Sequence, residues 1–538
     1  MRAAPFPVLI AAACCISLYA GQQVYTGQLQ RMPSQGNNTY TVTGTASNLL
    51  TGEPIRRALV HLQGRAQYAA FTGSDGRFRI ENVLEGQYNA VAQKPGFFEP
   101  SQIAPNPFRG SGSAIIVGAA TQPLSLTLVP AATITGRVVD NQGEPIPNIN
   151  VECLSEQIVN GRKRTTTSCG MGTDEDGNYA LENLVPGSYF IRVNQQKVFA
   201  FTGDLQTPNH VPLEVYPAQF YPNAPNRSSA QAIQLKPGDH AQIDFTLQPV
   251  PAFRVSGVVA PVGPMNQPAI ETADGEQTGI FAQVNQQTGR WVLPAISAGS
   301  WKIVFLTEGQ NNTLNYGEQS IDVRSANIQN VAVSLQPVPP VPVRVANSPD
   351  QGNPNLQLRL VPRNLDTNGR EYFAGAAPGE PPGSLSVRDI LPASYTVVAQ
   401  AFGNGCIDSI TSGSADLMRD DFVVSPGGQH APIDVSFRND CAILTVKLNT
   451  QDSASTVAVI LASDNRSFEP RILYQNAASE RVFPNLPPGE YRVYAFSNIE
   501  GLEYANPDAL RGLAGQQITL SANQKAELAL DVVQRGAN

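Results

Sequence analysis

The residues of this 538-residue chain that could do chemistry are first of all its four histidines. A zinc peptidase needs a His and a Glu three positions apart, together with a distant second His. No histidine has a Glu at that spacing, because Glu214 follows His210 one position too far. The motifs H-E-x-x-H, G-x-S-x-G and G-x-x-x-x-G-K do not occur either. The sequence therefore predicts no enzyme, no catalytic residue and no cofactor, and it predicts ordinary surface positions for the histidines, His61, His210, His240 and His430.

An acidic run, Asp-Glu-Asp-Gly-Asn at 174–178, is the feature that invites a metal site. Calcium prefers several oxygen ligands on a tight loop. The EF-hand pattern is not met, because no glutamate closes the loop at the required position. We interpret the run as the acidic tip of a hairpin and predict no metal ligands, with calcium binding as the alternative.

Aromatic residues could serve binding rather than catalysis. Trp291 and Trp301 are the two tryptophans of the chain, and exposed rings could stack on a sugar. Both occupy positions that are Phe or Tyr elsewhere in the chain, so we predict that they pack in a core. The segment 216–222, Tyr-Pro-Ala-Gln-Phe-Tyr-Pro, lies outside that pattern. Its rings, Tyr216, Phe220 and Tyr221, are the candidate ligand or partner surface, and packing over their own domain is the alternative.

Four of the six cysteines lie beyond residue 20, and four cysteines allow three pairings. Cys153 and Cys169 fall in one repeat, on strands expected to be neighbours. Cys406 follows a strong strand pattern, and Cys441 opens the next one. We therefore expect the disulfides 153–169 and 406–441, which are typical of an oxidising compartment. A zinc site is the competing interpretation, but no C-x-x-C pair and no nearby histidine supports it.

An internal repeat must position all of these residues. The repeat is an eleven-residue motif, called the phrase below, that begins with a turn residue. In most copies an aromatic or aliphatic residue stands two places on, and apolar residues stand four and seven places on. A small residue stands ten places on, and a strand led by an aromatic residue follows. The copies begin at Gly76, Gly177, Gly289, Gly383 and Ser479, and their aromatic residues are Tyr88, Tyr189, Trp301, Tyr395 and Tyr491. The spacing of about a hundred residues predicts five modules of one fold.

Each copy has the pattern of two strands joined by a corner. Phe78 and Ile80 alternate with polar residues, as in a strand with one buried face. Asp-Gly at 75–76 and 176–177, and Pro-Gly at 186–187 and 488–489, are turn dipeptides. A first strand, such as 133–139, precedes each unit, and an alternating strand, such as 243–247, closes it. The pattern therefore predicts an all-β fold of about five tandem β-sandwiches.

The repeat also sets the expected boundaries. We expect a signal peptide at 1–20, a disordered segment at 21–37, and sandwiches at 38–130, 131–250, 251–338, 339–438 and 439–538. Proline follows the closing strands, so the joints should be semi-rigid and the array an elongated rod with limited bending. Helices are nearly absent, and the best candidate is a single turn at 507–510 capped by Asn506.

The second repeat resembles a known family. Thr-Gly at 135–136, Gly-Glu-Pro-Ile at 143–146, Asp-Gly-Asn-Tyr at 176–179 and Pro-Gly-Ser-Tyr at 186–189 are similar to the carboxypeptidase regulatory-like domain. The first repeat is nearly as similar, repeats three to five keep the spacing without the turn before the second strand, and the last looks like the C-terminal module of large bacterial exported proteins. The resemblance implies a transthyretin-like (prealbumin-type), Ig-like β-sandwich. It also implies no activity, because in the namesake enzymes this module is an appendage to a zinc peptidase domain.

The N-terminus has the pattern of a secretory signal. Arg2 supplies the positive charge, an apolar run covers 7–19, and Ala20 offers a small residue at the cleavage site. The run is shorter than the roughly 20 residues that span a bilayer, so no transmembrane segment is predicted. Cys14 and Cys15 raise the alternative of a lipid anchor, although Ala-Ala-Ala at 11–13 is a poor lipobox. We expect an exported protein of the periplasm, the cell surface or the extracellular space.

Charge argues against nucleic acid as a partner, since the net charge is −8 and 15 % of the residues are charged. The basic cluster at 162–164 is expected to be a solvated loop tip. We therefore expect a non-catalytic, monomeric structural or interaction protein, whose partner is an envelope or extracellular protein or a glycan. One alternative is a carbohydrate- or peptide-binding accessory protein of an uptake or degradation system. The other is a hydrolase with a Ser/His/Asp site assembled across repeats.

Overall fold

The structure is a computed structural model that describes residues 38–103, 112–194, 214–264, 268–273, 275–309, 313–349, 355–363, 370–376, 384–449, 456–476 and 480–535. The predicted signal peptide with Ala20, the segment 21–37 and His210 lie outside these residues. Regular structure in the described residues is almost entirely strand, so the predicted all-β class with tandem sandwiches is confirmed. In this part of the chain, no helix is long and apolar enough to cross a membrane.

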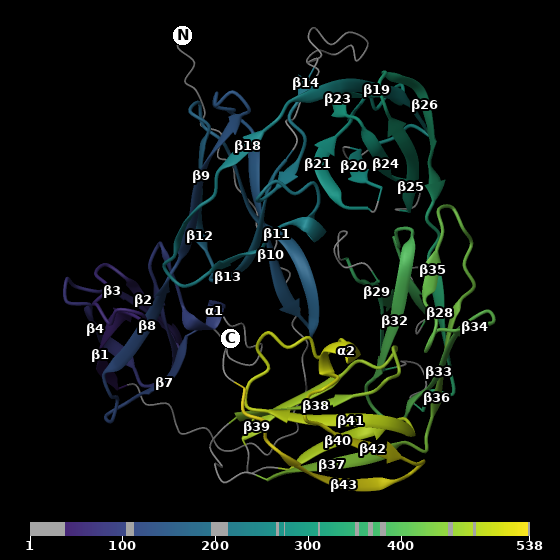
Figure 1. The fold of residues 1–538 in the computed structure, drawn as a ribbon. Coiled ribbons are helices and arrows are strands. Elements are labelled where there is room, and N and C mark those ends of the chain that lie inside the picture. Colours follow the sequence, from purple (N-terminus) through teal and green to yellow (C-terminus); the bar gives the residue numbers. More distant parts are fainter. Residues whose placement is uncertain are drawn as a thin grey trace, which may run out of the picture. The chain divides into compact units, whose positions relative to one another are not determined.

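The chain divides into two compact units, each described by itself. Of the described residues, the first comprises 38–47, 52–93 and 112–127, and the second comprises the others. The first sandwich, purple to blue in Figure 1, has two four-stranded sheets. Their strand orders are β4-β1-β8-β6 and β3-β2-β5-β7. Its elements are β1 (Thr39–Asn48), β2 (Leu59–Gly64), β3 (Gln67–Phe71), β4 (Arg77–Leu84), β5 (Gly86–Gln93), β6 (Phe97–Phe98), α1 (Pro100–Ile103), β7 (Ser113–Val117) and β8 (Leu124–Pro130).

The second sandwich opens the larger unit. One sheet has the order β12-β9-β17, with β18 also on β9, and the other has the order β11-β10-β13-β15, with β16 on β13. Its elements are β9 (Ala132–Asp140), β10 (Asn150–Val159), β11 (Arg162–Gly172), β12 (Asn178–Leu184), β13 (Gly187–Val193), β15 (Gln219–Phe220), the 3-10 helix η1 (Arg227–Ser229), β16 (Ile233–Leu235), β17 (His240–Gln242) and β18 (Phe245–Leu247).

The third sandwich borrows a strand from the segment that precedes it, because β14 (Glu214–Val215) pairs with β19. Its sheets have the orders β14-β19-β23-β22, with β26 on β19, and β21-β20-β24-β25-β27. The remaining strands are β19 (Val250–Ala260), β20 (Ala269–Thr272), β21 (Gln277–Phe281), β22 (Gln283–Val284), β23 (Arg290–Ser297), β24 (Gly299–Glu308), β25 (Leu314–Val323), β26 (Ile328–Ser334) and β27 (Gln336–Pro337).

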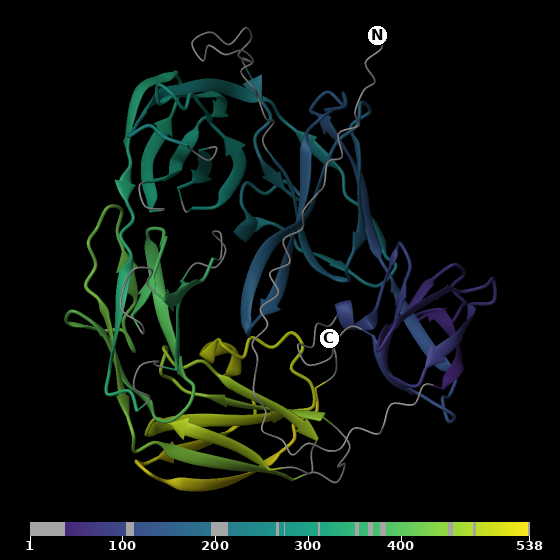
Figure 2. The same ribbon diagram turned by 180° about the vertical axis from the view of Figure 1, so that it is seen from behind.

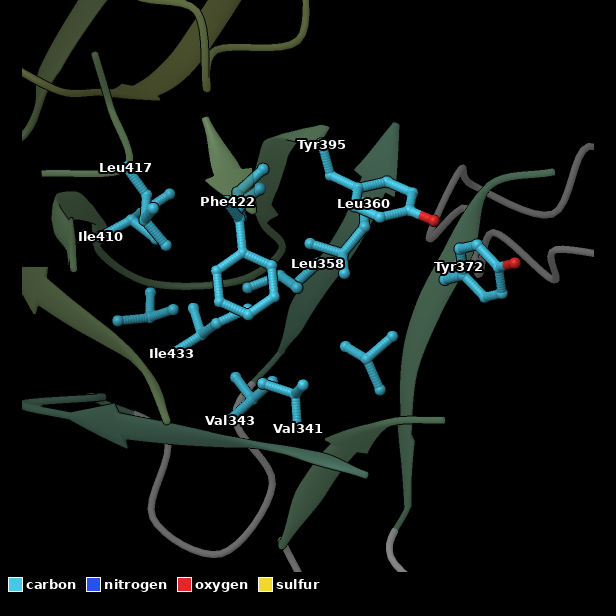
Figure 3. Packing of buried hydrophobic residues seen from close by; sticks show 14 of the residues in the cluster. Val341, Val343, Leu358, Leu360, Tyr372, Tyr395, Ile410, Leu417, Phe422 and Ile433 are labelled. Carbon is cyan, nitrogen blue, oxygen red and sulfur yellow. The ribbon is translucent and has the colours of Figure 1, made fainter. Parts of the chain in front are cut away.

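The fourth module differs from the other modules, which have two separate sheets each. Its strands form one nine-stranded sheet in the order β34-β33-β36-β28-β31-β30-β29-β32-β35. Strand β30 joins the layers by pairing with both β29 and β31. One apolar cluster still fills the interior, as Figure 3 shows for Leu358, Tyr395 and Phe422. The strands are β28 (Val341–Ala346), β29 (Leu356–Pro362), β30 (Tyr372–Ala376), β31 (Leu385–Val387), β32 (Ala393–Ala401), β33 (Cys406–Ser412), β34 (Ala415–Asp416), β35 (Phe422–Val424) and β36 (Ile433–Arg438).

The fifth sandwich, yellow in Figures 1 and 2, has the sheets β40-β37-β43 and β39-β38-β41-β42. The predicted single helical turn is found as α2 (Pro507–Leu510), where the Asn506 side chain accepts a hydrogen bond from the amide of Asp508 at 3.1 Å. The strands are β37 (Ala442–Asn449), β38 (Thr456–Ala462), β39 (Arg471–Asn476), β40 (Arg481–Leu486), β41 (Gly489–Phe496), β42 (Gln516–Leu520) and β43 (Lys525–Asp531).

The aromatic residue of each repeat closes the corner between two strands. In four sandwiches its polar atom donates a hydrogen bond to the carbonyl oxygen four residues earlier, at 2.5 to 3.1 Å. The donors are Tyr189, Trp301, Tyr395 and Tyr491. The first sandwich does not make this bond from Tyr88, and there the amide of Leu84 donates to the hydroxyl of Tyr68 at 3.1 Å. The ring therefore fixes both the corner and the inward face of the next strand.

A second corner residue was not singled out by the sequence pattern. The residue six places after the start of the phrase has a left-handed backbone in four copies, with φ between 53° and 57°. It is Asn82, Asn183, Asp389 and Asn485, and Asn and Asp tolerate this conformation better than other non-glycine residues. Around it the pairing of the two strands shifts register, as between Leu181 and Leu184. The corner is therefore a bulge as well as a turn.

Side chains that face each other on the first strand of a module and on the strand of the phrase are complementary in size. Gly136 lies opposite Tyr179, and a Cβ at Gly136 would lie 2.9 Å from Tyr179 Cε1 and would overlap the carbonyl oxygen of Ile243. Gly257 meets Trp291 and the carbonyl of Val331 in the same way. In the last two sandwiches valine replaces the glycine, and the facing residues are Leu385 and the buried Arg481. A large ring thus requires glycine on the neighbouring strand.

Replacing Tyr491 with Phe tests the corner bond. We expect Tyr491→Phe to destabilise the fifth sandwich by about 1–2 kcal/mol, because the carbonyl of Pro487 loses its donor. Tyr88→Phe is the matched control, since Tyr88 makes no bond of this kind. Hydrogen–deuterium exchange of peptides from β41 and β5 measures both effects, and equal protection losses in the two variants would contradict the interpretation.

Candidate functional site

The structure does not bring the histidines together. His61 lies half-buried on β2, His240 is exposed on β17, and His430 packs edge-on against Phe422 with ring centroids 5.6 Å apart. Burial lowers the pKa of His430 below its usual value. Among the residues that the structure describes, no group of three or more His, Cys, Asp or Glu side chains is placed to hold a metal ion.

The acidic run at 174–178 forms a hairpin turn. The carboxylate of Asp174 accepts hydrogen bonds from the amides of Asp176 and Asn178, at 3.0 and 2.8 Å. In the first sandwich Gly73 holds the place of Asp174, and Asp75, which matches Asp176, accepts a hydrogen bond from the amide of Arg77 at 3.1 Å. The turn itself therefore accounts for Asp174 without an ion.

Both tryptophans belong to the third sandwich. Trp291 is only 1 % exposed and packs beside Phe305, with ring centroids 5.7 Å apart. Trp301 is half-buried, and its indole nitrogen donates to the carbonyl of Ser297 at 3.1 Å. Their positions agree with the core packing predicted from the repeat.

The loop that carries the candidate ligand surface lies over its own sandwich. Phe220 is 3 % exposed and packs with Leu154, Phe190 and Ala224 on the outer side of β10 and β13. Strand β15 adds to the edge of β13, and the guanidinium of Arg192 lies 5.7 Å from the centre of the Phe220 ring. The loop therefore covers the outer face of a sheet, and Phe220 presents little surface to a ligand.

The other two rings of the loop are half-buried. Tyr216 and Tyr221 both pack against the core of the second sandwich, and Tyr221 meets Phe245 edge-on at a centroid distance of 6.2 Å. Burial raises the pKa of Tyr216, and the carboxylates of Asp140 and Glu214 raise it further. These placements favour the alternative considered for the segment, which is packing over its own domain.

The four cysteines form two disulfides with the expected pairing. Cys153 on β10 is bonded to Cys169 on β11, with Cα atoms 5.2 Å apart. Cys406 on β33 is bonded to Cys441, the residue before β37, with Cα atoms 5.9 Å apart. The first disulfide holds a hairpin within one sandwich, whereas the second joins the fourth sandwich to the fifth.

Arg162 and Arg164 of the basic cluster at 162–164 are not solvated, and the expectation of a solvated tip is corrected for these two residues. Arg164 forms an ion pair with Glu371, and Arg162 lies 3.9 Å from Glu469. Both arginine side chains are only 19 % exposed, and Glu371 is 8 % exposed. Arg359 bonds to both glutamates and completes a cluster of three arginines and two glutamates. Burial lowers the pKa of Arg162, an effect opposed by the charge of Glu469.

The tip of the β10–β11 hairpin docks beside this cluster. The amide of Ala505 donates to the carbonyl of Gly161 at 3.0 Å. A side chain at Gly161 would collide with the ring of Tyr504. The hairpin of the second sandwich therefore contacts residues of the fourth and fifth sandwiches within the larger unit. Arg162 and Arg164 are thus largely buried in ion pairs, whereas Lys163 is 48 % exposed and pairs with Glu156 at 2.9 Å.

Comparison with known proteins supports the family resemblance for part of the chain. Residues 41–112 and 133–248 match the family model described as carboxypeptidase regulatory-like domain. These ranges fall in the first two sandwiches, whose turns carry the resemblance, and the other three sandwiches lie outside the match. A comparison with curated protein sequences finds no match.

Several solved structures are similar at low identity. The TIE protein of Bacillus anthracis is 15 % identical, with a TM-score of 0.17, over 55 % of this chain and 51 % of that one, so this chain spans about half its length. The shaft pilin SpaA of Lactobacillus rhamnosus GG is 10 % identical, with a TM-score of 0.21, over 39 % and 98 %. GBS52, the minor pilin of Streptococcus agalactiae, is 13 % identical, with a TM-score of 0.20, over 42 % and 100 %.

Removal of each disulfide should destabilise the protein, and the loss should grow with the logarithm of the loop length. Chain entropy predicts a loss of about 4 kcal/mol for the Cys406→Ser, Cys441→Ser variant and about 3 kcal/mol for the Cys153→Ser, Cys169→Ser variant. The loops close over 35 and 16 residues. Urea unfolding of the full chain measures both, and a larger loss from the shorter loop would contradict this ranking.

The charge cluster predicts a local effect of Glu371. Glu371→Gln removes the negative partner of Arg164 and Arg359, so the hairpin tip should undock more often. We expect about tenfold faster hydrogen exchange at the tip, as for the loss of a charged hydrogen bond of about 1.5 kcal/mol. Glu480→Gln is the control, because the Glu480 side chain is exposed and its ion pair with Lys447 contributes little to stability. Unchanged exchange in Glu371→Gln would show that the ion pairs do not hold the hairpin.

Proposed function

We propose that the protein is exported and acts without catalysis as a structural and interaction protein of the envelope, in the periplasm, at the cell surface or in the extracellular space. The observation that carries this proposal is the pair of disulfides, which together use all four cysteines beyond residue 20. Disulfides persist in oxidising compartments and are rare in the cytosol. The signal pattern ending at Ala20 agrees with export on independent grounds.

The contacts between sandwiches support a scaffold role. Arg192 of the second sandwich bonds to Glu152 of its own sheet at 2.7 Å and to Glu276 of the third sandwich at 3.1 Å. The hairpin docking at Gly161 and the disulfide between the fourth and fifth sandwiches add further links. Links of this kind between modules suit a protein that holds partners.

The working units that we propose are the sandwiches at 38–130, 131–250, 251–338, 339–438 and 439–538, in a monomer whose partner is an envelope or extracellular protein or glycan. The match of the first two sandwiches to a regulatory-like family supports a non-catalytic role, because that module accompanies a separate catalytic domain in the namesake enzymes.

Cell fractionation with thiol labelling tests the proposal. After expression of the full chain in a bacterial host, we expect the protein in the envelope or the medium, with an N-terminus that begins after Ala20. All four cysteines should resist maleimide until a reductant is added, because they are paired. Recovery from the cytosol with reactive thiols would contradict export, and hydrolysis of any member of a broad substrate panel would contradict the absence of catalysis.

A further inference from the structure

The first sandwich has an outer sheet face without charge. The side chains of β2, β3, β5 and β7 that alternate with the buried core residues point away from the interior. We call this set the neutral face. Its members are Leu59, His61, Gln63, Gln67, Ala69, Phe71, Gln87, Asn89, Val91, Gln93, Ala114 and Ile116. Five of the twelve are amides, and none carries a carboxylate, an ammonium or a guanidinium group.

Large apolar side chains of the neutral face are open to solvent. Phe71 is 66 % exposed and Ile116 is 73 % exposed, whereas Val91 is buried. Strand pairing places Leu59 next to Phe71, and it aligns Gln67, Gln63 and Asn89 in one row across β3, β2 and β5. The apolar pair and the amide row therefore lie about 13 Å apart along the strands, at 3.3 Å per residue, on one continuous surface of three strands.

The equivalent faces of the other sandwiches are charged or covered. The second carries the Glu152–Arg192 pair beneath the Phe220 loop, and in the third Lys302 pairs with Glu271 and Glu318. In the fourth, Arg359 pairs with Glu371. The fifth is covered, since Leu502 and Leu510 pack on Tyr494 and Phe496. The same structural position is thus neutral and open in the first sandwich, so the fold alone does not explain its composition.

The chemistry of the neutral face fits a neutral polysaccharide. A sugar ring offers an apolar C–H surface and a rim of hydroxyl groups. An exposed phenyl ring matches the first, and an amide, which both donates and accepts, matches the second. Protein interfaces usually depend on Trp, Tyr and Arg anchors, and the neutral face has none. A charged ligand would find no opposite charge on this surface.

We propose that the neutral face of the first sandwich binds a neutral polysaccharide, with Phe71 stacking on a sugar ring and Gln63, Gln67 and Asn89 bonding to hydroxyl groups. This inference rests on the interaction role proposed above, and it assigns a ligand class and a location to it. The site differs from the segment 216–222, whose rings are used for packing in the second sandwich.

Affinity electrophoresis of the full chain tests the proposal. The probes are the neutral polysaccharides glucomannan, mixed-linkage β-glucan and dextran, and the anionic polysaccharide alginate. We expect retardation by at least one neutral polymer and none by alginate. Phe71→Ala should weaken binding about tenfold, as expected for loss of one stacking contact, and Gln63→Ala should weaken it about threefold.

Phe281→Ala is the matched control for Phe71→Ala. Phe281 also ends an edge strand, lies opposite Ala269 as Phe71 lies opposite Leu59, and is 43 % exposed. Its sheet carries the Lys302 ion pairs, so we expect wild-type binding. Thermal unfolding of each variant verifies the fold, because truncation of an exposed ring should leave the melting temperature nearly unchanged.

Several results would overturn the inference. These are no retardation by any neutral polymer, equal retardation by alginate, or unchanged binding by Phe71→Ala. Sedimentation of the free protein adds a further test, since a dimer that Phe71→Ala dissociates would make the neutral face a self-association surface. Failure of polysaccharide binding leaves the export and disulfide results intact, whereas cytosolic protein with free thiols would contradict the proposed function by itself.

Discussion

The corner between the strand of the phrase and the strand that follows it is the constraint on which the rest of each sandwich depends. An Asn or Asp with a left-handed backbone begins the bulge in four copies, and an aromatic ring then fixes the start of the next strand. Because side chains alternate along a strand, a slip of one residue would exchange the buried and exposed sets of the whole sheet. The corner therefore determines which residues of the following strand face outward, and so whether the outer face of a module is charged, covered or neutral.

Features encoded within a few neighbouring residues could be predicted from the sequence. The corner rings, the hairpin turns at Gly76 and Gly177 and the turn capped by Asn506 all belong to this kind, and both cysteine pairs were inferred from strand order. Contacts between distant segments could not be predicted in this way. Arg164 belongs to a basic cluster in sequence, and its partner Glu371 lies 207 residues further on. The joined layers of the fourth module depend on β30, a five-residue strand without a distinctive pattern.

The structure shows how the candidate binding residues pack, which the sequence alone could not decide. Aromatic content pointed to Tyr216, Phe220 and Tyr221, but an aromatic ring serves equally well to cover the module that carries it, and only the packing distinguishes the two uses. The neutral face did leave a signal in the sequence, because the outward positions of β2, β3 and β5 are free of charge. The signal can be recognised only once the strand register shows which residues share one surface. It also requires comparison with the other modules, whose equivalent faces are charged or covered.

The disulfide between Cys406 and Cys441 has a mechanical consequence. If the chain is pulled from its two ends, tension enters the fourth module at β28 and passes through the covalent bond to β37, so it does not follow the backbone between the two cysteines. That segment, which covers a sequence separation of 35 and includes β33 to β36, cannot lengthen under load. The bond thereby withholds about 120 Å of contour length, at roughly 3.5 Å per residue. Reduction would release this reserve, and the extensibility of the chain thus depends on the redox state of its surroundings.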